Sequence, residues 1–247
     1  MKILYDNQIL DSTVTCSNVN SSYPIANIQD TRLSKYFRSD TDADFGIIIN
    51  LTGLTASYIA ILNHNLSSGA TITLQANATD SWGAPTFSQA ITWGSGMIVQ
   101  SFTEQTFAYW RLLISDNSNP DTYIKIGHLY LSGSLTLPAM AQDQVVDKKT
   151  TSKNSISYSG QAYGKQMYMY RSAKVNFPFI SLTQRDDMLD LFISQENIYP
   201  VIVLIWEANL DIESPIYSVI DQDSFGMSRN GKIAKPFKMS FQIREVF

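Results

Sequence analysis

Polar and apolar positions alternate along much of the first half of the chain, which is the pattern of β-strands with one face in a core. Residues 45–51, 71–76 and 109–114 follow this period of two, whereas 58–62 is a continuous apolar run typical of a strand buried on both faces. Residues 2–5 predict a short strand at the edge of a sheet. With the turn residues between them, about eight such strands predict an antiparallel β-sandwich.

The register of the apolar positions changes within the last strand of this half. Ile124 and Ile126 are at even-numbered positions, whereas Leu129 and Leu131 are at odd-numbered positions. One extra residue in a strand produces such a change, so we expect a β-bulge at Gly127-His128.

A junction separates this half from the next. Residues 136–147 are largely apolar but show no period, and they contain Pro138. We therefore expect two domains, 1–135 and 148–247, joined by this segment.

The second domain is predicted to contain the one helix of the chain. Alternate apolar positions from Met167 to Phe177 indicate a long strand before it. A capping box of Ser181 and Gln184 then marks the start of a helix expected over about 181–195. Its core-facing side is predicted from helical spacing to comprise Met188, Leu189, Phe192 and Ile193. Further strands follow, so the predicted fold class is all-β with one helix.

Two stretches about a hundred residues apart carry a family resemblance. Ala26–Asp30, the tripeptide Phe37-Arg38-Ser39 and an apolar strand ending at Leu51 lie near the start, and Ile126–Gly133 closes the first domain. Together they resemble the two ends of a discoidin-like jelly roll, the family of the coagulation-factor C domains and of many carbohydrate-binding modules. The resemblance covers roughly residues 1–135 and implies a jelly-roll β-sandwich there.

The second domain has its own resemblance. The strand at Arg171–Phe179, the short helix after it and the terminal strand at Phe237–Val246 are similar, in order and texture, to a small sandwich-plus-helix domain. Tail-tube and distal-tail proteins of long-tailed phages share that domain. The resemblance implies a tail-tip or baseplate protein that is made in the host cytoplasm and resides in the virion tail.

Composition narrows the classes of function. The net charge of −4 disfavours general nucleic-acid binding. Cys16 is the single cysteine, so no disulfide is expected within the chain. No run approaches the roughly 20 apolar residues of a membrane helix, and the first residues hold too short an apolar run for a signal peptide. We expect a chain made in the cytosol with no membrane partner.

Catalysis is not indicated by the titratable residues. The chain has two histidines, His64 and His128, and lacks the motifs of nucleophile elbows, zinc peptidases and phosphate-binding loops. The carboxylates fall mostly on predicted loops, and no two of them form an evident acid–base pair. The prediction is therefore a protein that is not an enzyme and needs no cofactor.

Two acidic features are candidates for binding a metal ion. Asp40, Asp42 and Asp44 occupy alternate positions, which can wrap a hard cation, but they lack the glycine and distal glutamate of a calcium loop, and a solvated loop is favoured. Asp30 matches an acidic residue that joins a closing-strand glutamate in a calcium site of many discoidin-like modules. His128 stands at the glutamate position and is a poor calcium ligand, so Asp30 is expected to cap its turn instead.

Loop tryptophans are the candidates for carbohydrate binding. Trp82 and Trp93 bracket a predicted loop, and an exposed indole can stack on a sugar ring. The resemblance supports this interpretation, because discoidin-like sugar sites use loop aromatics. The alternative is that both indoles fold back over the end of the sandwich.

Residues 148–166 form a predicted basic arm. Six basic and no acidic residues occur from Lys148 to Lys174, and the Ser, Thr, Asn, Gly and Tyr content predicts an extended arm or long hairpin. The low charge density disfavours single-stranded nucleic acid as its partner and favours contact with a neighbouring subunit, with a solvated loop before assembly as the alternative. The residues assigned to this inter-subunit arm are Lys148, Lys149, Lys153, Tyr158, Tyr163 and Lys165.

The function predicted from the sequence is therefore structural. The carboxy-terminal domain is expected to form a ring, sixfold in the phage-tail interpretation, through head-to-tail contacts. The expected partners are further copies of the chain, the tail tube, the tail hub and receptor-binding fibres. The alternative function is adhesion to a host-surface glycan through the amino-terminal jelly roll.

Overall fold

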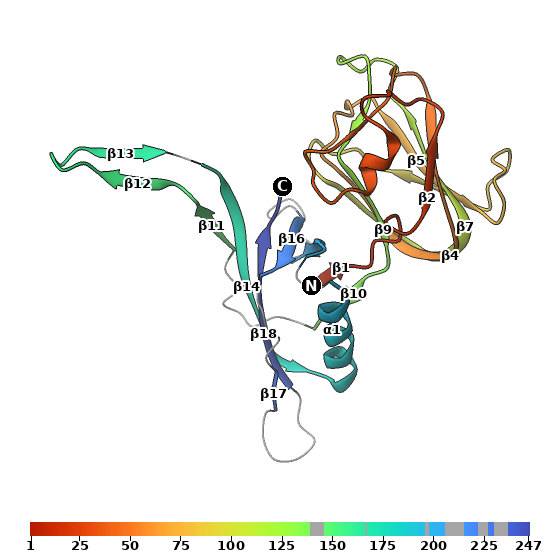
Figure 1. Cartoon of the computed structure of the whole chain (residues 1–247). Coiled ribbons are helices and arrows are strands. Elements are labelled where there is room, and N and C mark those ends of the chain that lie inside the picture. The colour runs from red at the N-terminus through yellow and green to blue at the C-terminus, as the bar shows by residue number, and fades with distance from the viewer. Residues whose placement is uncertain (139–145, 166, 196–197, 206–214, 222–226, 230–236) are drawn as a thin grey trace. The chain divides into compact units, whose positions relative to one another are not determined.

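The structure is a computed structural model that describes residues 1–138, 146–165, 167–195, 198–205, 215–221, 227–229 and 237–247. Within these ranges strands dominate and a single α-helix occurs (Figure 1), so the predicted all-β class with one helix is confirmed. The chain divides into two compact units. The amino-terminal unit comprises Leu4–Ser134 with Phe247, and the carboxy-terminal unit comprises Met1–Ile3 with Leu135–Val246.

Six strands build the main sheet of the amino-terminal unit. Its order is β2-β4-β7-β5-β6, with β9 paired to β4 as well, and the pairings are antiparallel. The strands are β2 (Thr13–Cys16), β4 (Phe45–Leu62), β5 (Thr71–Asn77), β6 (Phe87–Ile91), β7 (Ile98–Ser115) and β9 (His128–Ser132). The sheet folds over on itself to give the jelly-roll sandwich.

The two central strands, β4 and β7, are each 18 residues long. The sequence predicts two separate strands in the range of β4, at 45–51 and 58–62, because the apolar pattern breaks between them. The structure instead runs one strand through both, with register shifts between Asn50 and Leu54 and between Ala56 and Tyr58. Gly53, at φ +75°, takes the left-handed conformation that glycine adopts without strain. Both strands therefore contribute to both layers.

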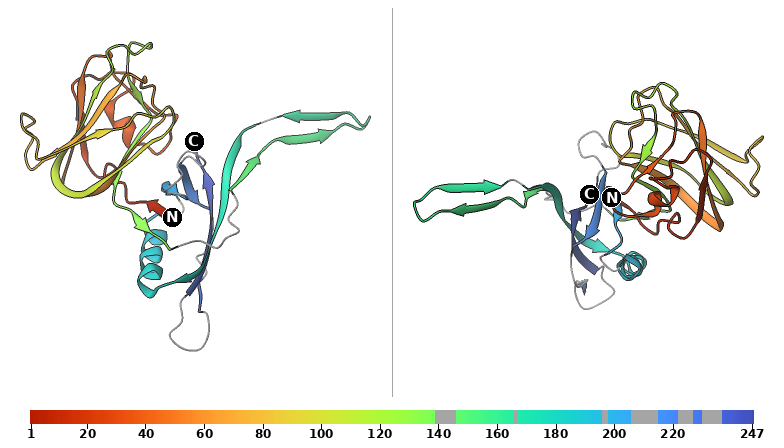
Figure 2. Two further views of the ribbon diagram at one scale, coloured as in Figure 1. Left: turned by 180° about the vertical axis from the view of Figure 1, so that it is seen from behind. Right: turned by 45° about the horizontal axis from the view of Figure 1, so that its top comes forward.

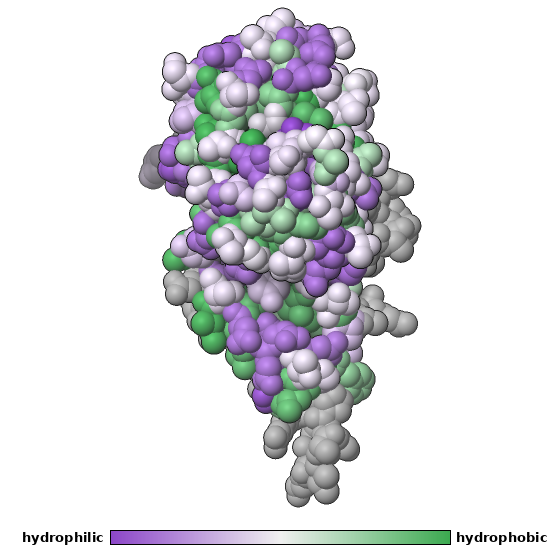
Figure 3. Space-filling view, turned by 90° about the vertical axis from the view of Figure 1, so that its right-hand side faces the viewer, coloured by the Kyte–Doolittle hydropathy of each residue, from purple (hydrophilic) through white to green (hydrophobic). Residues whose placement is uncertain are grey.

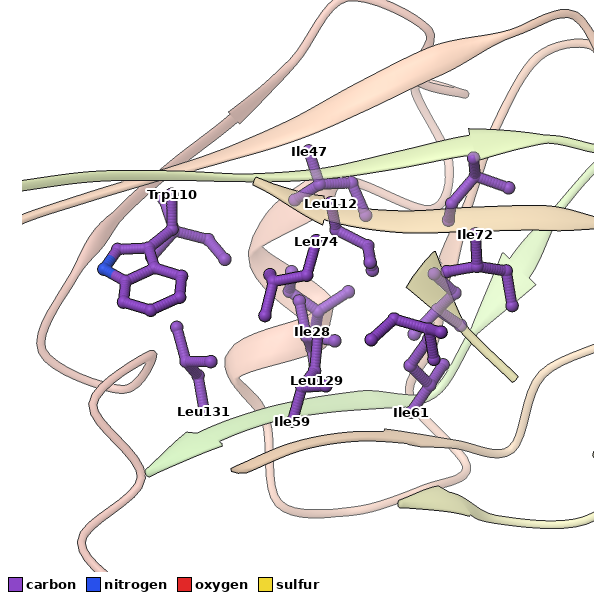
Figure 4. Close-up of a cluster of buried hydrophobic side chains, with 14 of the residues drawn as sticks. Ile28, Ile47, Ile59, Ile61, Ile72, Leu74, Trp110, Leu112, Leu129 and Leu131 are labelled. Atoms are coloured by element: carbon purple, nitrogen blue, oxygen red, sulfur yellow. The ribbon is translucent and has the colours of Figure 1, made fainter. Parts of the chain in front are cut away.

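The core of this unit lies between the two halves of the bent strands. Figure 4 shows the two sets of side chains that face each other, Ile47, Leu74 and Leu112 on one side and Ile59, Ile61 and Leu129 on the other. Trp110 is fully buried and packs against the rings of Phe87, Phe102 and Phe107, with centroids 6.0, 5.8 and 6.2 Å away. Burial of this apolar surface is the main term that stabilises the unit.

The closing strand changes its partner at Gly127. β8 (Lys125–Ile126) pairs with β3 (Phe37–Arg38), whereas β9 pairs with β4. In place of the β-bulge predicted at Gly127-His128, the strand breaks at Gly127, whose N–H donates to the carbonyls of both Leu62 and Asn63, at 3.0 and 3.1 Å. The 3₁₀ helix η1 (Ile25–Gln29) buries Ile28 in the same core.

An eight-stranded sheet forms the centre of the carboxy-terminal unit, in the order β10-β1-β15-β16-β18-β14-β11 with β17 beside β18. The strands are β1 (Lys2–Leu4), β10 (Leu135–Thr136), β11 (Val146–Thr150), β14 (Met169–Ile180), β15 (Val201–Leu204), β16 (Ile216–Ile220), β17 (Met227–Arg229) and β18 (Phe237–Glu245). The prediction of an edge strand at residues 2–5 is wrong, since β1 lies between β10 and β15. Local sequence does not reveal partners so far along the chain.

Helix α1 (Leu182–Gln195) lies beside the strands of this sheet (Figure 1). Its start has the expected capping box. The Gln184 N–H donates to Ser181 Oγ at 3.1 Å, and the Ser181 N–H donates to Gln184 Oε1 at 2.9 Å.

The buried side of α1 differs from the predicted one. Met188 is buried as expected, but Ile193 is 67% exposed, and Leu191 and Gln195 complete the buried side. Spacings of three and four residues keep these three buried side chains together. The core face is therefore rotated by roughly a quarter turn from the predicted face.

Residues 153–165 form a two-stranded hairpin beyond the sheet, which we call the arm hairpin. It consists of β12 (Lys153–Ile156) and β13 (Ala162–Lys165), and it follows β11 and precedes β14 in the chain (Figures 1 and 2). Gly160, at φ +81°, takes a left-handed conformation in its turn.

We predict that Gly127→Ala destabilises the protein by about 1–3 kcal/mol, the usual cost of overpacking. A Cβ at this position lies 2.7 Å from Asn63 Cβ and 3.0 Å from the backbone oxygen of Leu33, so backbone must move. Urea unfolding followed by circular dichroism measures the change. The matched control is Gly133→Ala, where no atom lies within 4 Å of the added Cβ. Equal stabilities of the two variants would contradict the prediction.

Candidate functional site

On the face of the molecule in Figure 3, apolar residues occur in small groups between polar and neutral ones. Three tyrosines and two cations stack on one another at the surface of the amino-terminal unit, and we call this cluster the tyrosine–arginine ladder. It contains Tyr23, Tyr36, Arg38, Tyr123 and Lys125.

The ladder is a continuous stack. The guanidinium carbon of Arg38 lies 3.9 Å from the ring centroid of Tyr123 and 5.9 Å from that of Tyr23. The rings of Tyr23 and Tyr36 are stacked with centroids 4.8 Å apart and planes 10° apart. Lys125 Nζ lies 5.5 Å from the centroid of Tyr36. Cation–π attraction and ring stacking both stabilise this order.

Strands β3 and β8 position the ladder. Arg38 and Lys125 are register partners across this antiparallel pair. The Arg38 N–H donates to the carbonyl of Tyr23 at 3.2 Å, which fixes the loop before η1 beside β3. Phe37 and Ile124 alternate with the ladder residues and are fully buried. The period of two along each strand therefore turns the ladder residues outward.

The ladder is cationic and incompletely hydrogen-bonded. Arg38 Nε is buried without a hydrogen-bond partner, and neither Arg38 nor Lys125 forms an ion pair with a carboxylate of the described residues. A hydrogen bond between the side chains of Tyr36 and Tyr23 is the largest cause that raises the pKa of Tyr36. A buried N–H without an acceptor is costly, and guanidinium groups bind carboxylates and phosphates well. The site suits a ligand that carries an anionic group and hydroxyls.

Trp82 lies on the outer surface of β5 and β7. Its indole N–H donates to Asp80 at 2.6 Å, and the Arg111 guanidinium covers its ring at 4.7 Å. Arg111 in turn donates to Gln75 Oε1 and crosses Gly46, where a Cβ would lie 2.8 Å from Arg111 Cδ. One face of the Trp82 ring is therefore already in contact with Arg111 of the protein itself.

Trp93 packs against the hydrophobic core and is half-buried. Its indole N–H donates to the carbonyl of Leu66 at 2.9 Å. This is the fold-back arrangement that the alternative interpretation describes. Since Trp82 contacts Asp80 and Arg111 instead, the structure does not join the two indoles in one site.

Asp30 caps its turn, as expected. Its carboxylate accepts the Arg32 backbone N–H at 3.0 Å, and it also binds the Arg32 guanidinium at 2.6 Å and Lys35 Nζ at 3.1 Å. The Arg32 hydrogen bond is the largest cause that holds the pKa of Asp30 well below its usual range. The carboxylate is therefore neutralised by cations of its own loop.

His128 is buried in the jelly roll. Its Nε2 lies 3.2 Å from Asn7 Nδ2. Desolvation is the main cause that lowers the pKa of His128 to about 4. The imidazole is therefore neutral at physiological pH.

The acidic loop is spread over separate partners. Asp40 accepts a hydrogen bond from Asn20 at 2.9 Å, and Asp44 accepts one from Asn117 at 2.8 Å. Asp42 lies between them and is half-buried. In the part of the chain that the structure describes, no three His, Cys, Asp or Glu side chains gather as a metal site requires.

The residues assigned to the inter-subunit arm lie on the exposed strands of the carboxy-terminal unit. Lys148 and Lys149 are on β11, Lys153 is on β12, Tyr163 and Lys165 are on β13, and Tyr158 is in the turn between β12 and β13. All six are exposed.

Sequence reasoning missed the ladder. The alternation of buried and outward-facing positions along the chain did hold a signal. Tyr36 and Arg38 flank buried Phe37, and Tyr123 and Lys125 flank buried Ile124. Each pair therefore points outward. The pairing of β3 with β8 that brings them together spans almost ninety residues and leaves no mark in the local pattern.

The comparisons with known proteins give matches among solved structures. No family model matches the sequence, and no curated protein matches it either. Chitosan-binding module 1 of a chitosanase/glucanase from Paenibacillus sp. IK-5 is 19% identical, with a TM-score of 0.43 over 52% of this chain and 100% of that chain.

Two further solved structures are modules that bind other sugars. A Streptococcus pneumoniae fucose-binding module is 10% identical, with a TM-score of 0.43 over 51% of this chain and 94% of that chain. A Clostridium perfringens module in complex with GalNAc-β-1,3-galactose is 8% identical, with a TM-score of 0.42 over 51% and 99%. Likeness of this extent identifies no function. Separately, no helix in the described ranges has the length and apolar character to cross a membrane.

The buried histidine gives a prediction about pH. An unfolded chain binds a proton on His128 below a pKa of 6.5, whereas the folded chain binds it only below about 4. Between these values the unfolded state holds more protons, so stability is full above pH 6.5 and falls by about 3 kcal/mol toward pH 4. In His128→Gln this contribution is absent.

The measurement is the free energy of unfolding of both proteins, from urea titrations across this pH range. The expected result is a shallower dependence on pH for His128→Gln, whatever its stability at neutral pH. Parallel curves for the two proteins would show that His128 is not the buried neutral group described above.

Proposed function

We propose that the amino-terminal unit is a non-catalytic module that binds an anionic glycan at the tyrosine–arginine ladder. The observation that carries this proposal is the Arg38 guanidinium, which stacks on Tyr123 with its Nε buried and lacking a hydrogen-bond partner. Lys125 adds a second cation at the register position opposite Arg38. The ligand class is a sugar bearing a carboxylate or phosphate.

The chemistry of the ladder fits such a ligand in two ways. The cations neutralise the anionic group and bind it through charge-assisted hydrogen bonds, which are about twice as strong as neutral ones. The hydroxyls of Tyr23, Tyr36 and Tyr123 can donate to and accept from the hydroxyls of a sugar. Since the Arg38 guanidinium carbon lies over the Tyr123 ring, 3.9 Å from its centroid, this contact orders the Arg38 side chain before a ligand arrives, which lowers the ordering cost of binding.

A glycan array probed with the full chain tests the proposal. The expected result is enrichment for glycans that carry uronic acid, sialic acid or phosphate over their neutral counterparts. For the best ligand, Arg38→Gln should lower the affinity about tenfold or more, because a hydrogen bond to a charged group contributes about 1.5–3 kcal/mol. Isothermal titration calorimetry measures the affinity.

The matched control is Arg32→Gln, which removes an exposed arginine of the same region that pairs with Asp30. It should leave the affinity unchanged. Thermal unfolding shows whether Arg38→Gln retains the fold. An affinity that Trp82→Ala abolishes and Arg38→Gln leaves intact would move the site to the loop tryptophan and reject the ladder. The absence of binding to every anionic glycan would reject the proposed function.

A second function is favoured by a different observation, the exposure of the arm hairpin. We propose that the carboxy-terminal unit is a structural subunit of a ring in a phage-type tail tip or baseplate, with further copies, tail tube, tail hub and fibres as partners and the virion tail as its location. An isolated two-stranded hairpin is marginally stable in water, so a protein that keeps one exposed has a use for it at an interface. The lysines of the arm suit acidic surfaces of a neighbour.

This role predicts a defined copy number in mass photometry, alone or with a tail-tube partner added. Lys148, Lys149 and Lys153 replaced together by Glu should weaken assembly, because the arm then loses its positive charge. The monomer should keep its circular dichroism spectrum, since all three lysines are exposed. If this triple variant assembles like the wild type, the arm does not contribute to assembly.

A further inference from the structure

The arm hairpin carries large apolar side chains that are exposed in the part of the chain that the structure describes. Ile156 is 77% exposed, Tyr158 is fully exposed, and Tyr163 is 59% exposed. Among the described strands, β12 and β13 pair only with each other, so the hairpin is a ribbon of two strands. A two-stranded ribbon of this kind gains stability when a further surface packs on it.

The charge of this segment is opposite to that of the remaining chain. Residues 148–174 hold six of the 18 basic residues and none of the 22 acidic ones. The remaining residues therefore carry 12 basic and 22 acidic side chains, a net charge of −10. A second copy of this chain thus offers the arm a surface of complementary sign.

The two faces of the hairpin are not alike. Lys153 pairs with Lys165, and Ser155 with Tyr163, so by alternation these four side chains share one face. Ile156 lies on the opposite face. We call the first the arm face, and it presents two cations beside one aromatic ring.

Helix α1 offers a matching surface in the same unit. Leu182 and Ile193 are 56% and 67% exposed, and they lie eleven residues apart, close to three full turns. Asp186 falls on the same line, and Asp190 borders it. This outer stripe of α1 faces away from buried Leu191 and combines apolar and acidic side chains. Asp186 also pairs with Arg185, which leaves Asp187 and Asp190 as further carboxylates of the helix.

The spacings of the two surfaces agree. Tyr163 and the lysine pair are separated by about 7 Å along the hairpin, at the rise of two strand residues. Along α1, Ile193 lies about 4.5 Å from Asp190 and about 10 Å from Asp186, at 1.5 Å per residue. With Tyr163 against Ile193, the lysine pair therefore falls between the two aspartates.

From these observations we infer that the arm face of one copy packs against the outer stripe of α1 in a second copy. The inference rests on the assembly role proposed above and names its contact. The two surfaces differ, so the interface is head-to-tail and closes into a ring when the rotation between copies allows. The apolar pairs supply buried area, and the charges set the register.

A charge-exchange experiment on the full chain tests this contact. Lys153 and Lys165 are replaced by Glu in one variant, and Asp186 and Asp190 by Lys in another. Each variant alone should self-associate about tenfold more weakly or worse, because like charges then face each other. An equimolar mixture should recover assembly, since each interface between unlike variants again joins opposite charges. Mass photometry and sedimentation velocity measure the oligomers.

The control variant carries Asp11→Lys and Glu104→Lys, two exposed acidic residues of the amino-terminal unit whose replacement changes the net charge as much as the Asp186 and Asp190 variant does. It should assemble like the wild type. A mixture that fails to recover, or a wild-type chain that stays monomeric at every accessible concentration, would overturn the inference. Glycan affinity of the same variants by calorimetry separates this outcome from a failure of the ladder. If the variant with Asp186→Lys and Asp190→Lys assembles like the wild type, the chain still forms a ring but α1 is excluded as the contact.

Discussion

The pairing of β4 with β7 is the contact on which the jelly roll depends. These two strands occupy the centre of the sheet order, and each bends so that it serves both layers. The register shifts between Asn50 and Leu54 and between Ala56 and Tyr58 interrupt the pairing locally, and it resumes on both sides of each shift. One long pairing therefore closes the core around Trp110, and the remaining strands attach to its edges.

The tyrosine–arginine ladder depends on this pairing because β8, which carries Lys125, continues directly into β9, and β9 pairs with β4. Gly127 lets the chain leave β3 and join β4, because any larger residue meets the backbone of Leu33. The same change of partner places Lys125 opposite Arg38 and buries His128 beneath the surface. The short strands β3 and β8 thus determine which side chains of the ladder face outward, because successive side chains alternate. Since Phe37 is buried, its neighbour Arg38 points outward.

Local pattern was enough to predict the fold class and the helix. The alternation of 45–51 and the capping box at Ser181 depend on nearest neighbours, and these are visible in sequence. The ladder was not visible, because it is made by pairings between residues 37–38 and 125–126, and stacking leaves no periodic trace. The position of β1 inside a sheet was hidden for the same reason. The tryptophans were prominent in sequence by their size, but size alone does not show whether an indole packs inward, as Trp93 does.

The two units differ in how much they need a neighbour, and this difference connects their proposed functions. The jelly roll has its own closed core, so a ligand at the ladder needs no assembly to find its site. The described residues of the arm hairpin form a two-stranded ribbon without a core, so its stability depends on what it contacts. The proposed site consists of two cations and three tyrosine rings at the surface, and a surface site that buries little of a sugar gives modest affinity by itself. The proposed ring adds to the proposed glycan site, because several ladders on one scaffold can bind a glycan-covered surface together, and each further contact is then intramolecular. If both proposals hold, assembly through the arm turns a weak glycan site into effective adhesion.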